Sequence, residues 1–95
     1  MLIVTGSLTA RPDNFDMFLG EAIAHVRRSR DEDGCLHHGV ARDCEHPYRL
    51  VFVERWRDRA ALDAHFRVRG SIAFVTAIRR EAETWEGPEI YEVAA

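Results

Sequence analysis

The chain has 95 residues, of which 46% are hydrophobic and 31% charged, a composition that predicts one folded domain over residues 1–95. All 13 basic residues are arginines. With 16 acidic residues, the net charge is −3. The absence of lysine excludes Schiff-base catalysis, and the scattered, balanced charge argues against a nucleic-acid-binding surface. With neither a signal-peptide pattern nor a membrane-length apolar stretch in the sequence, we expect a cytoplasmic protein with reduced cysteines and no membrane partner.

The first half of the chain predicts a strand, a helix and a second strand. β-Branched residues dominate the first segment, residues 2–9. With Asp13 as N-cap, apolar residues then recur over residues 15–26 at the spacing of one helix face, and Gly34 ends the helical segment. Residues 35–42 follow as the second strand.

The second half predicts a strand, an interrupted helix and a final strand. A strand over residues 48–56 is followed by a helix from the N-cap Asp58 through Phe66. The helix restarts after Gly70-Ser71, and this second part holds Phe74, Ile78, Ala82 and Trp85. Gly87-Pro88 ends it, and residues 89–93 form the last strand. This β-α-β-β-α-β order predicts an α+β, ferredoxin-like protomer, with an antiparallel sheet and the helices on one of its faces. The other face would be bare and apolar, so we expect a homodimer.

Two Cys-x-His pairs, Cys35-Leu36-His37 and Cys44-Glu45-His46, contain residue types that bind zinc. The two cysteines lie near opposite ends of one predicted strand, about 30 Å apart at ~3.3 Å per residue, whereas zinc ligands lie within about 2.0–2.3 Å of one ion. The same separation excludes a disulfide between them. We therefore expect no metal site, and no phosphate-loop or dinucleotide motif indicates a cofactor.

Histidines are the main candidates for acid–base chemistry. His65 shares the predicted buried helix face with Leu62, where it is either a general base or a hydrogen-bonded core residue. His37 and His38 point to opposite faces of their strand. One of them could line a pocket or lie in an interface, and the pattern does not distinguish which.

Trp56 ends the strand with the strongest β pattern, on the same face as Phe52 and Glu54. Its indole could belong to the core or form the flat wall of a pocket for an aromatic ligand. Glu54 would be costly to bury without a partner, so either an arginine pairs with it or it lies at the mouth of a pocket, and an exposed edge position is favoured.

Residues 54–65, Glu-Arg-Trp-Arg-Asp-Arg-Ala-Ala-Leu-Asp-Ala-His, resemble the E-x-W-x-[DN]-x-x-A-[LI]-x-x-H pattern of the antibiotic biosynthesis monooxygenase family. Further features of the family pattern have counterparts at Pro12, Gly34-Cys35-Leu36, His46-Pro47 and Tyr91. The resemblance implies ferredoxin-like protomers that pair through their sheets into a dimeric α+β barrel.

The family that the chain resembles is functionally mixed. Some members oxidise phenolic polyketides or quinols with dioxygen and no cofactor, while others cleave haem, isomerise small metabolites or have no known activity. Haem-cleaving members use an asparagine in the first strand and a helix histidine as iron ligand. Residues 2–9 here contain no asparagine and residues 69–72 no histidine, so haem is not expected.

The resemblance therefore favours a cofactor-independent monooxygenase that oxidises a small phenolic, quinol or polyketide-like aromatic substrate with dioxygen. His65 would assist proton transfer and Trp56 would stack on the substrate ring. The residues expected to contact the substrate are His38, Phe52, Phe66 and Phe74. Two alternatives remain at this point: a non-catalytic small-molecule-binding or structural dimer, and a small-metabolite isomerase.

Overall fold

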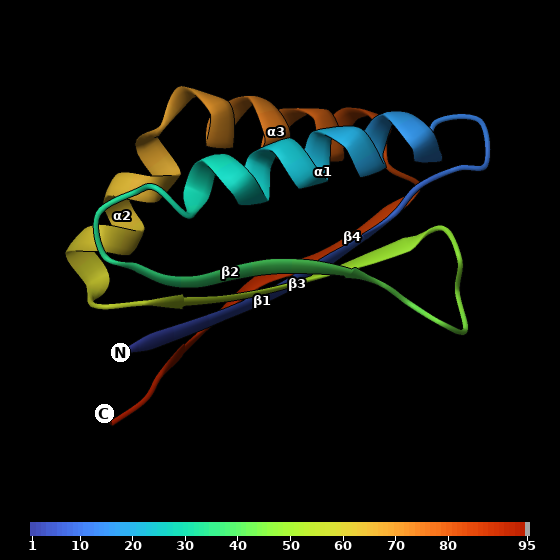
Figure 1. Ribbon diagram of the computed structural model, residues 1–95. Helices are drawn as coiled ribbons and strands as arrows, with labels where there is room; N and C mark the ends of the chain where they lie inside the picture. The colour runs from blue at the N-terminus through green and yellow to red at the C-terminus, as the bar shows by residue number, and fades with distance from the viewer. Residues whose placement is uncertain (95) are drawn as a thin grey trace.

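The structure, a computed structural model, describes residues 1–94 and consists of two layers, with all helices packed on one face of a four-stranded antiparallel sheet (Figure 1). The strands are β1 (Leu2–Thr9), β2 (Cys35–Arg42), β3 (Arg49–Trp56) and β4 (Thr84–Glu92), in the sheet order β2-β3-β1-β4. The helices are α1 (Phe15–Ser29), α2 (Arg59–Arg67) and α3 (Arg69–Glu81). The ferredoxin-like α+β protomer is confirmed. Among the described residues, no helix combines the length and apolarity needed to cross a membrane.

The core lies between the sheet and the helices because alternate strand residues point toward the helix layer. Leu8 and Leu50 pack with Phe18 of α1 in the larger of two hydrophobic clusters. The second cluster joins Trp56, at the end of β3, to Leu62 of α2. It fixes α2 against the sheet, and α2 also carries His65.

The end of α3 differs from the sequence-based prediction. The helix stops at Glu81, and Trp85, expected on the helix, lies in β4. There it is the β-ladder partner of Leu8 in β1. The helical spacing of apolar residues continues past the end of α3 by coincidence, and the pairing of β4 with β1 decides the conformation of Trp85. Gly87-Pro88, expected to precede the last strand, lies inside β4, where a proline is tolerated because β4 is an edge strand.

Two helix boundaries also differ from the prediction. The N-cap of α1 is Asn14, one residue after the expected Asp13. The chain breaks between α2 and α3 at the extended residue Val68, and Gly70 lies within α3. A Cβ at Gly70 would lie 2.4 Å from the guanidinium of Arg28, so this glycine leaves room for the Arg28 side chain and does not interrupt the helix.

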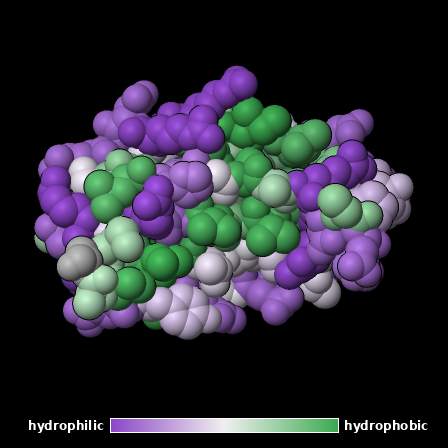
Figure 2. Space-filling model, turned by 60° about the horizontal axis from the view of Figure 1, so that its bottom comes forward, coloured by the Kyte–Doolittle hydropathy of each residue, from purple (hydrophilic) through white to green (hydrophobic). Residues whose placement is uncertain are grey.

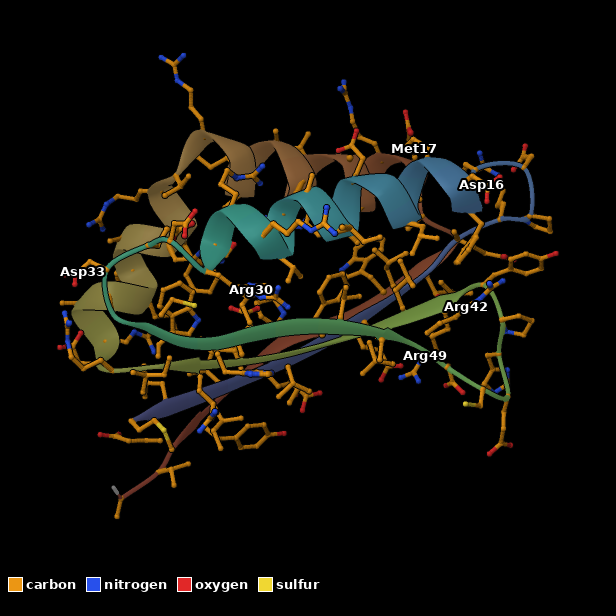
Figure 3. The ribbon with its side chains drawn as sticks, in the orientation of Figure 1. Asp16, Met17, Arg30, Asp33, Arg42 and Arg49 are labelled. Atoms are coloured by element: carbon orange, nitrogen blue, oxygen red, sulfur yellow. The ribbon has the colours of Figure 1, made fainter. Side chains whose placement is uncertain are left out.

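The connection from α1 to β2 holds α1, α2 and the sheet together. Arg30, which follows α1 and lies between α1 and β2 in Figure 3, donates a hydrogen bond of 2.9 Å from Nε to the carbonyl of His38. Gly34 has a positive φ of 81°, and a Cβ there would lie only 2.4 Å from the Cβ of Ala61 in α2. Both the backbone conformation and the close approach require glycine at this position.

We predict that Gly34→Ala lowers the free energy of unfolding by about 1–3 kcal/mol, because it adds both backbone strain and a clash with α2. Gly20 is the matched control: it lies within α1, and a Cβ there meets nothing within 4 Å. Gly20→Ala should stabilise the protein by about 0.5–1 kcal/mol. Urea denaturation of both variants measures the difference. A Gly34→Ala protein as stable as the wild type would contradict this account of how α2 is seated.

Candidate active site

A cavity of about 420 Å³ opens between α3 and the inner face of the sheet. The three phenylalanines expected to contact a substrate, Phe52, Phe66 and Phe74, all line it. Trp85 of β4 adds a further aromatic side chain, which the sequence analysis missed because it assigned this residue to a helix. The volume and the aromatic lining suit a small planar ligand.

Polar side chains from several elements line the same cavity. Four of them are His25 from α1, Glu54 from β3, His65 from α2 and Ser71 from α3. All four residues are buried, and their polar groups stand in a largely apolar surrounding. In such a setting charges and hydrogen bonds act more strongly than they do in water.

His65 is held by a carboxylate on the side of the ring that bears Nδ1. Its Nδ1 lies 2.8 Å from Glu32 Oε1, and its side chain is only 3% exposed. A carboxylate accepts a hydrogen bond and does not donate one, so in the neutral ring Nδ1 carries the proton and Nε2 the lone pair. Nε2 lies 3.8 Å from Glu54 Oε1. In the neutral His65 ring, Nε2 is therefore a basic nitrogen beside the cavity.

Glu54 is buried, so the predicted exposed edge position is wrong. The indole Nε1 of Trp56 donates a hydrogen bond of 2.9 Å to Glu54 Oε1, and His38 Nε2 lies 3.3 Å from the same oxygen. Burial raises the pKa of the Glu54 carboxyl, but the contacts from His38 and Trp56 outweigh it and hold the pKa below its usual value. Glu54 is therefore a buried anion with partners, and it also lines the cavity.

The structure distinguishes the two neighbouring histidines of β2. His38 is the ladder partner of Glu54 on the inner face of the sheet and is 1% exposed, whereas His37 is exposed. His38 is not among the cavity-lining residues, so its expected contact with substrate is replaced by contact with Glu54. Within residues 1–94, neither ring nitrogen of His38 has a hydrogen-bond partner of good geometry.

Trp56 does not reach the cavity. It is fully buried, and its ring lies against that of His65 with the two centroids 4.6 Å apart and the planes tilted by 36°. The expectation that Trp56 stacks on a bound ring is therefore corrected. Trp56 supports His65 and donates a hydrogen bond to Glu54, and the aromatic walls of the cavity come from other residues.

His25 is a site residue that the sequence analysis missed. Burial, with smaller contributions from His38 and His65, lowers its pKa to about 3, so the ring is neutral at pH 7. Arg28 Nη2 lies 3.0 Å from His25 Nδ1, which must accept this hydrogen bond because a guanidinium only donates. His25 follows Ala22 at helical spacing, and this position on the apolar face of α1 was the available signal.

Three imidazoles meet beside the cavity. One ring nitrogen each of His25, His38 and His65 lies within 4.8 Å of the others. The sequence analysis considered only the two Cys-x-His pairs as metal ligands, whereas these three histidines come from α1, β2 and α2.

A model of the antibiotic biosynthesis monooxygenase family matches residues 1–77. The chain belongs to this family. Among curated proteins, it is 33% identical over 66 residues to the Synechocystis protein sll1783, a match that covers 70% of this chain and 45% of that protein. The chain thus spans less than half of this relative.

Solved structures of the antibiotic biosynthesis monooxygenase family share the fold. A structure from Deinococcus radiodurans named for the family superposes with a TM-score of 0.92 at 23% identity, covering 100% of this chain and 94% of the other. A crystal structure of an antibiotic biosynthesis monooxygenase is 28% identical, with a TM-score of 0.85 and full coverage of both chains. The first of these matches is evidence for the fold alone.

Proposed function

We propose that this chain is a monooxygenase that uses dioxygen to oxidise a small phenol or quinol without a cofactor. One observation carries the proposal: His65, with Nδ1 held by Glu32 at 2.8 Å, lies at a cavity whose walls include Phe52 and Phe74. An oriented base beside an aromatic-lined cavity is what proton removal from a phenol requires. Family membership supports the same class of reaction.

The reaction begins with transfer of the phenol proton to His65 Nε2. Glu54 Oε1, 3.8 Å from this nitrogen, stabilises the imidazolium that forms. The phenolate then gives one electron to dioxygen, and the phenoxyl radical combines with superoxide at a ring carbon that bears hydrogen. Protonation gives a hydroperoxide. Loss of the ring C–H proton and cleavage of the O–O bond yield a quinone and one water, so the substrate supplies all the electrons.

The residues around His65 position it for this step. Glu32 fixes the tautomer and the orientation of the ring, and Trp56 packs against one side of it. Ser71 Oγ, 3.5 Å from His65 Nδ1, further limits rotation of the imidazole. A base that is oriented before the substrate arrives loses little freedom in the transition state.

The outer face of the sheet supports a second proposal, that the protein is a homodimer. Figure 2 shows hydrophobic side chains gathered on the face that lies opposite the helices in Figure 1. Val53 and Tyr91 are respectively 43% and 50% exposed there, and Ile3 lies beside Tyr91 in the ladder. A second copy that places its own sheet against this face would cover it and form the α+β barrel of the family.

We predict that His65→Ala lowers the turnover of a phenolic substrate by about 10²–10⁴-fold, the usual contribution of a general base. Oxygen uptake with a panel of hydroquinones and anthrones measures turnover, and the melting temperature of each preparation measures folding. His65→Gln is a second variant that keeps a hydrogen-bonding side chain, and His37→Ala, at an exposed histidine, should leave both quantities unchanged.

Wild-type turnover by well-folded His65→Ala protein would overturn the assignment of the base. Turnover of a substrate without oxygen uptake would instead indicate an isomerase. Binding of aromatic ligands without turnover would indicate a non-catalytic binding protein.

For the dimer, sedimentation equilibrium at micromolar protein should give twice the mass of one chain, because obligate interfaces of this kind bury about 2,000 Å² or more. Val53→Glu, which places a charge in the centre of the proposed interface, should shift the protein toward monomer. Met17→Glu is the control, because Met17 is a similarly exposed apolar residue on α1, in the opposite layer (Figure 3). A folded wild-type monomer would contradict the proposal.

A further inference from the structure

We infer that His25, His38 and His65, with the carboxylate of Glu54, form a binding site for a divalent transition-metal ion. The four residues come from α1, β2, α2 and β3, and all are buried. The inference goes beyond the proposed function, because it concerns an ion that the proposed reaction does not use. It rests on the convergence of ligand atoms and on an unsatisfied buried imidazole.

The ligand atoms are already near the spacing that a metal ion needs. In a tetrahedral zinc site with Zn–N distances of about 2.0–2.1 Å, neighbouring ligand atoms lie roughly 3.4 Å apart. Glu54 Oε1 lies 3.3 Å from His38 Nε2 and 3.8 Å from His65 Nε2. The three imidazole nitrogens lie within 4.8 Å of one another. Coordination of one ion requires the His25 and His65 side chains to move until these distances reach about 3.4 Å.

His38 supplies the second, independent observation. Its side chain is 0% exposed. In the described part of the chain Nδ1 has no hydrogen-bond partner, and Nε2 has only its 3.3 Å contact with Glu54 Oε1, which is not a well-formed hydrogen bond. A buried polar group in this state is uncommon in proteins and calls for an unseen partner. A bound cation would take the lone pair of one nitrogen. The position of Glu54 beside Nε2 indicates that this is the ligating atom.

His65 has the environment of a metal-ligating histidine. Such a histidine commonly donates its second ring N–H to a carboxylate, which fixes the tautomer and makes the ligating nitrogen more basic. Glu32 takes that role at Nδ1, at 2.8 Å. Nε2 is then the ligating atom of His65, on the side of the ring that faces Glu54.

Arg28 controls whether His25 can join the site. Because the guanidinium donates to His25 Nδ1, the neutral ring carries its proton on Nε2. Coordination through Nδ1 would displace Arg28 directly, and coordination through Nε2 would move the proton to Nδ1, which could no longer accept from Arg28. Arg28 must withdraw in both cases, and its exposed position allows it to turn toward solvent.

The donor set selects the class of ion. Three imidazoles and one carboxylate suit Zn²⁺ and its neighbours Co²⁺, Ni²⁺ and Cu²⁺, whereas Mg²⁺ and Ca²⁺ prefer sites built from oxygen. The cavity reaches His25, Glu54 and His65 and provides a path for entry. An ion bound here would occupy the His65 lone pair, so metal binding and the proposed oxygenation would exclude one another.

Direct binding measurements test the site. Chelator-treated Cys35→Ala/Cys44→Ala protein, which lacks both thiols, is titrated with ZnCl₂ by calorimetry and with CoCl₂ by visible absorption. We expect one ion per chain and the visible bands of four-coordinate Co²⁺. His38→Gln and His25→Gln should each weaken zinc binding by more than the roughly 10–100-fold typical of losing a second-layer hydrogen-bond partner. His37→Gln and His46→Gln, at the two exposed histidines, should not weaken it.

Arg28→Met should tighten zinc binding, because it removes the competing hydrogen bond. The melting temperature of each variant identifies any that fails to fold. The two ligand variants, His38→Gln and His25→Gln, and the cobalt spectrum are three separate measurements of the same site. Absence of stoichiometric binding, or equal loss in the His37→Gln and His38→Gln proteins, would overturn the inference. Zinc binding without oxygen uptake by the metal-free protein would contradict only the proposed function.

Discussion

The burial of one carboxylate organises the interior of this protein. An ionised Glu54 could not remain under the helices without partners, since an unpaired buried charge costs several kcal/mol or more. Trp56 and His38 supply the two closest partners, and His65 lies just beyond hydrogen-bonding distance of the same oxygen. The end of β3, strand β2 and helix α2 thereby meet around Glu54 Oε1, and the cavity opens beside this atom.

The residue pattern shared with the family follows from this geometry. Glu54 and Trp56 are two residues apart and therefore point to the same inner face of β3. Asp58 then caps α2 by accepting a hydrogen bond of 2.9 Å from the backbone N–H of Ala61. The cap fixes the start of the helix, and the helical repeat brings His65 back over the ring of Trp56. The spacing of the motif is the spacing needed to place a histidine against a buried Trp–Glu pair.

Alternation of side chains along the strands and the helical spacing of apolar residues predicted the fold, apart from the boundary between α3 and β4 and two helix boundaries. They could not predict which strand pairs with Thr84 and Trp85, because that depends on contacts distant in sequence. The same limit applied to the site. His65 was recognisable from its motif, whereas Glu32 carried no local signal because it lies between elements and meets His65 only in three dimensions.

The central claim is that Glu32 orients His65 with a free Nε2 beside Glu54. The most direct measurement is nitrogen-15 NMR of the histidine side chains in metal-free protein, which reports the protonation of each ring nitrogen. We predict that His65 in the neutral state carries its proton on Nδ1, and that Glu32→Gln changes the His65 signals but not those of the exposed His37 and His46. A neutral His65 protonated on Nε2, or one indifferent to Glu32→Gln, would contradict the account.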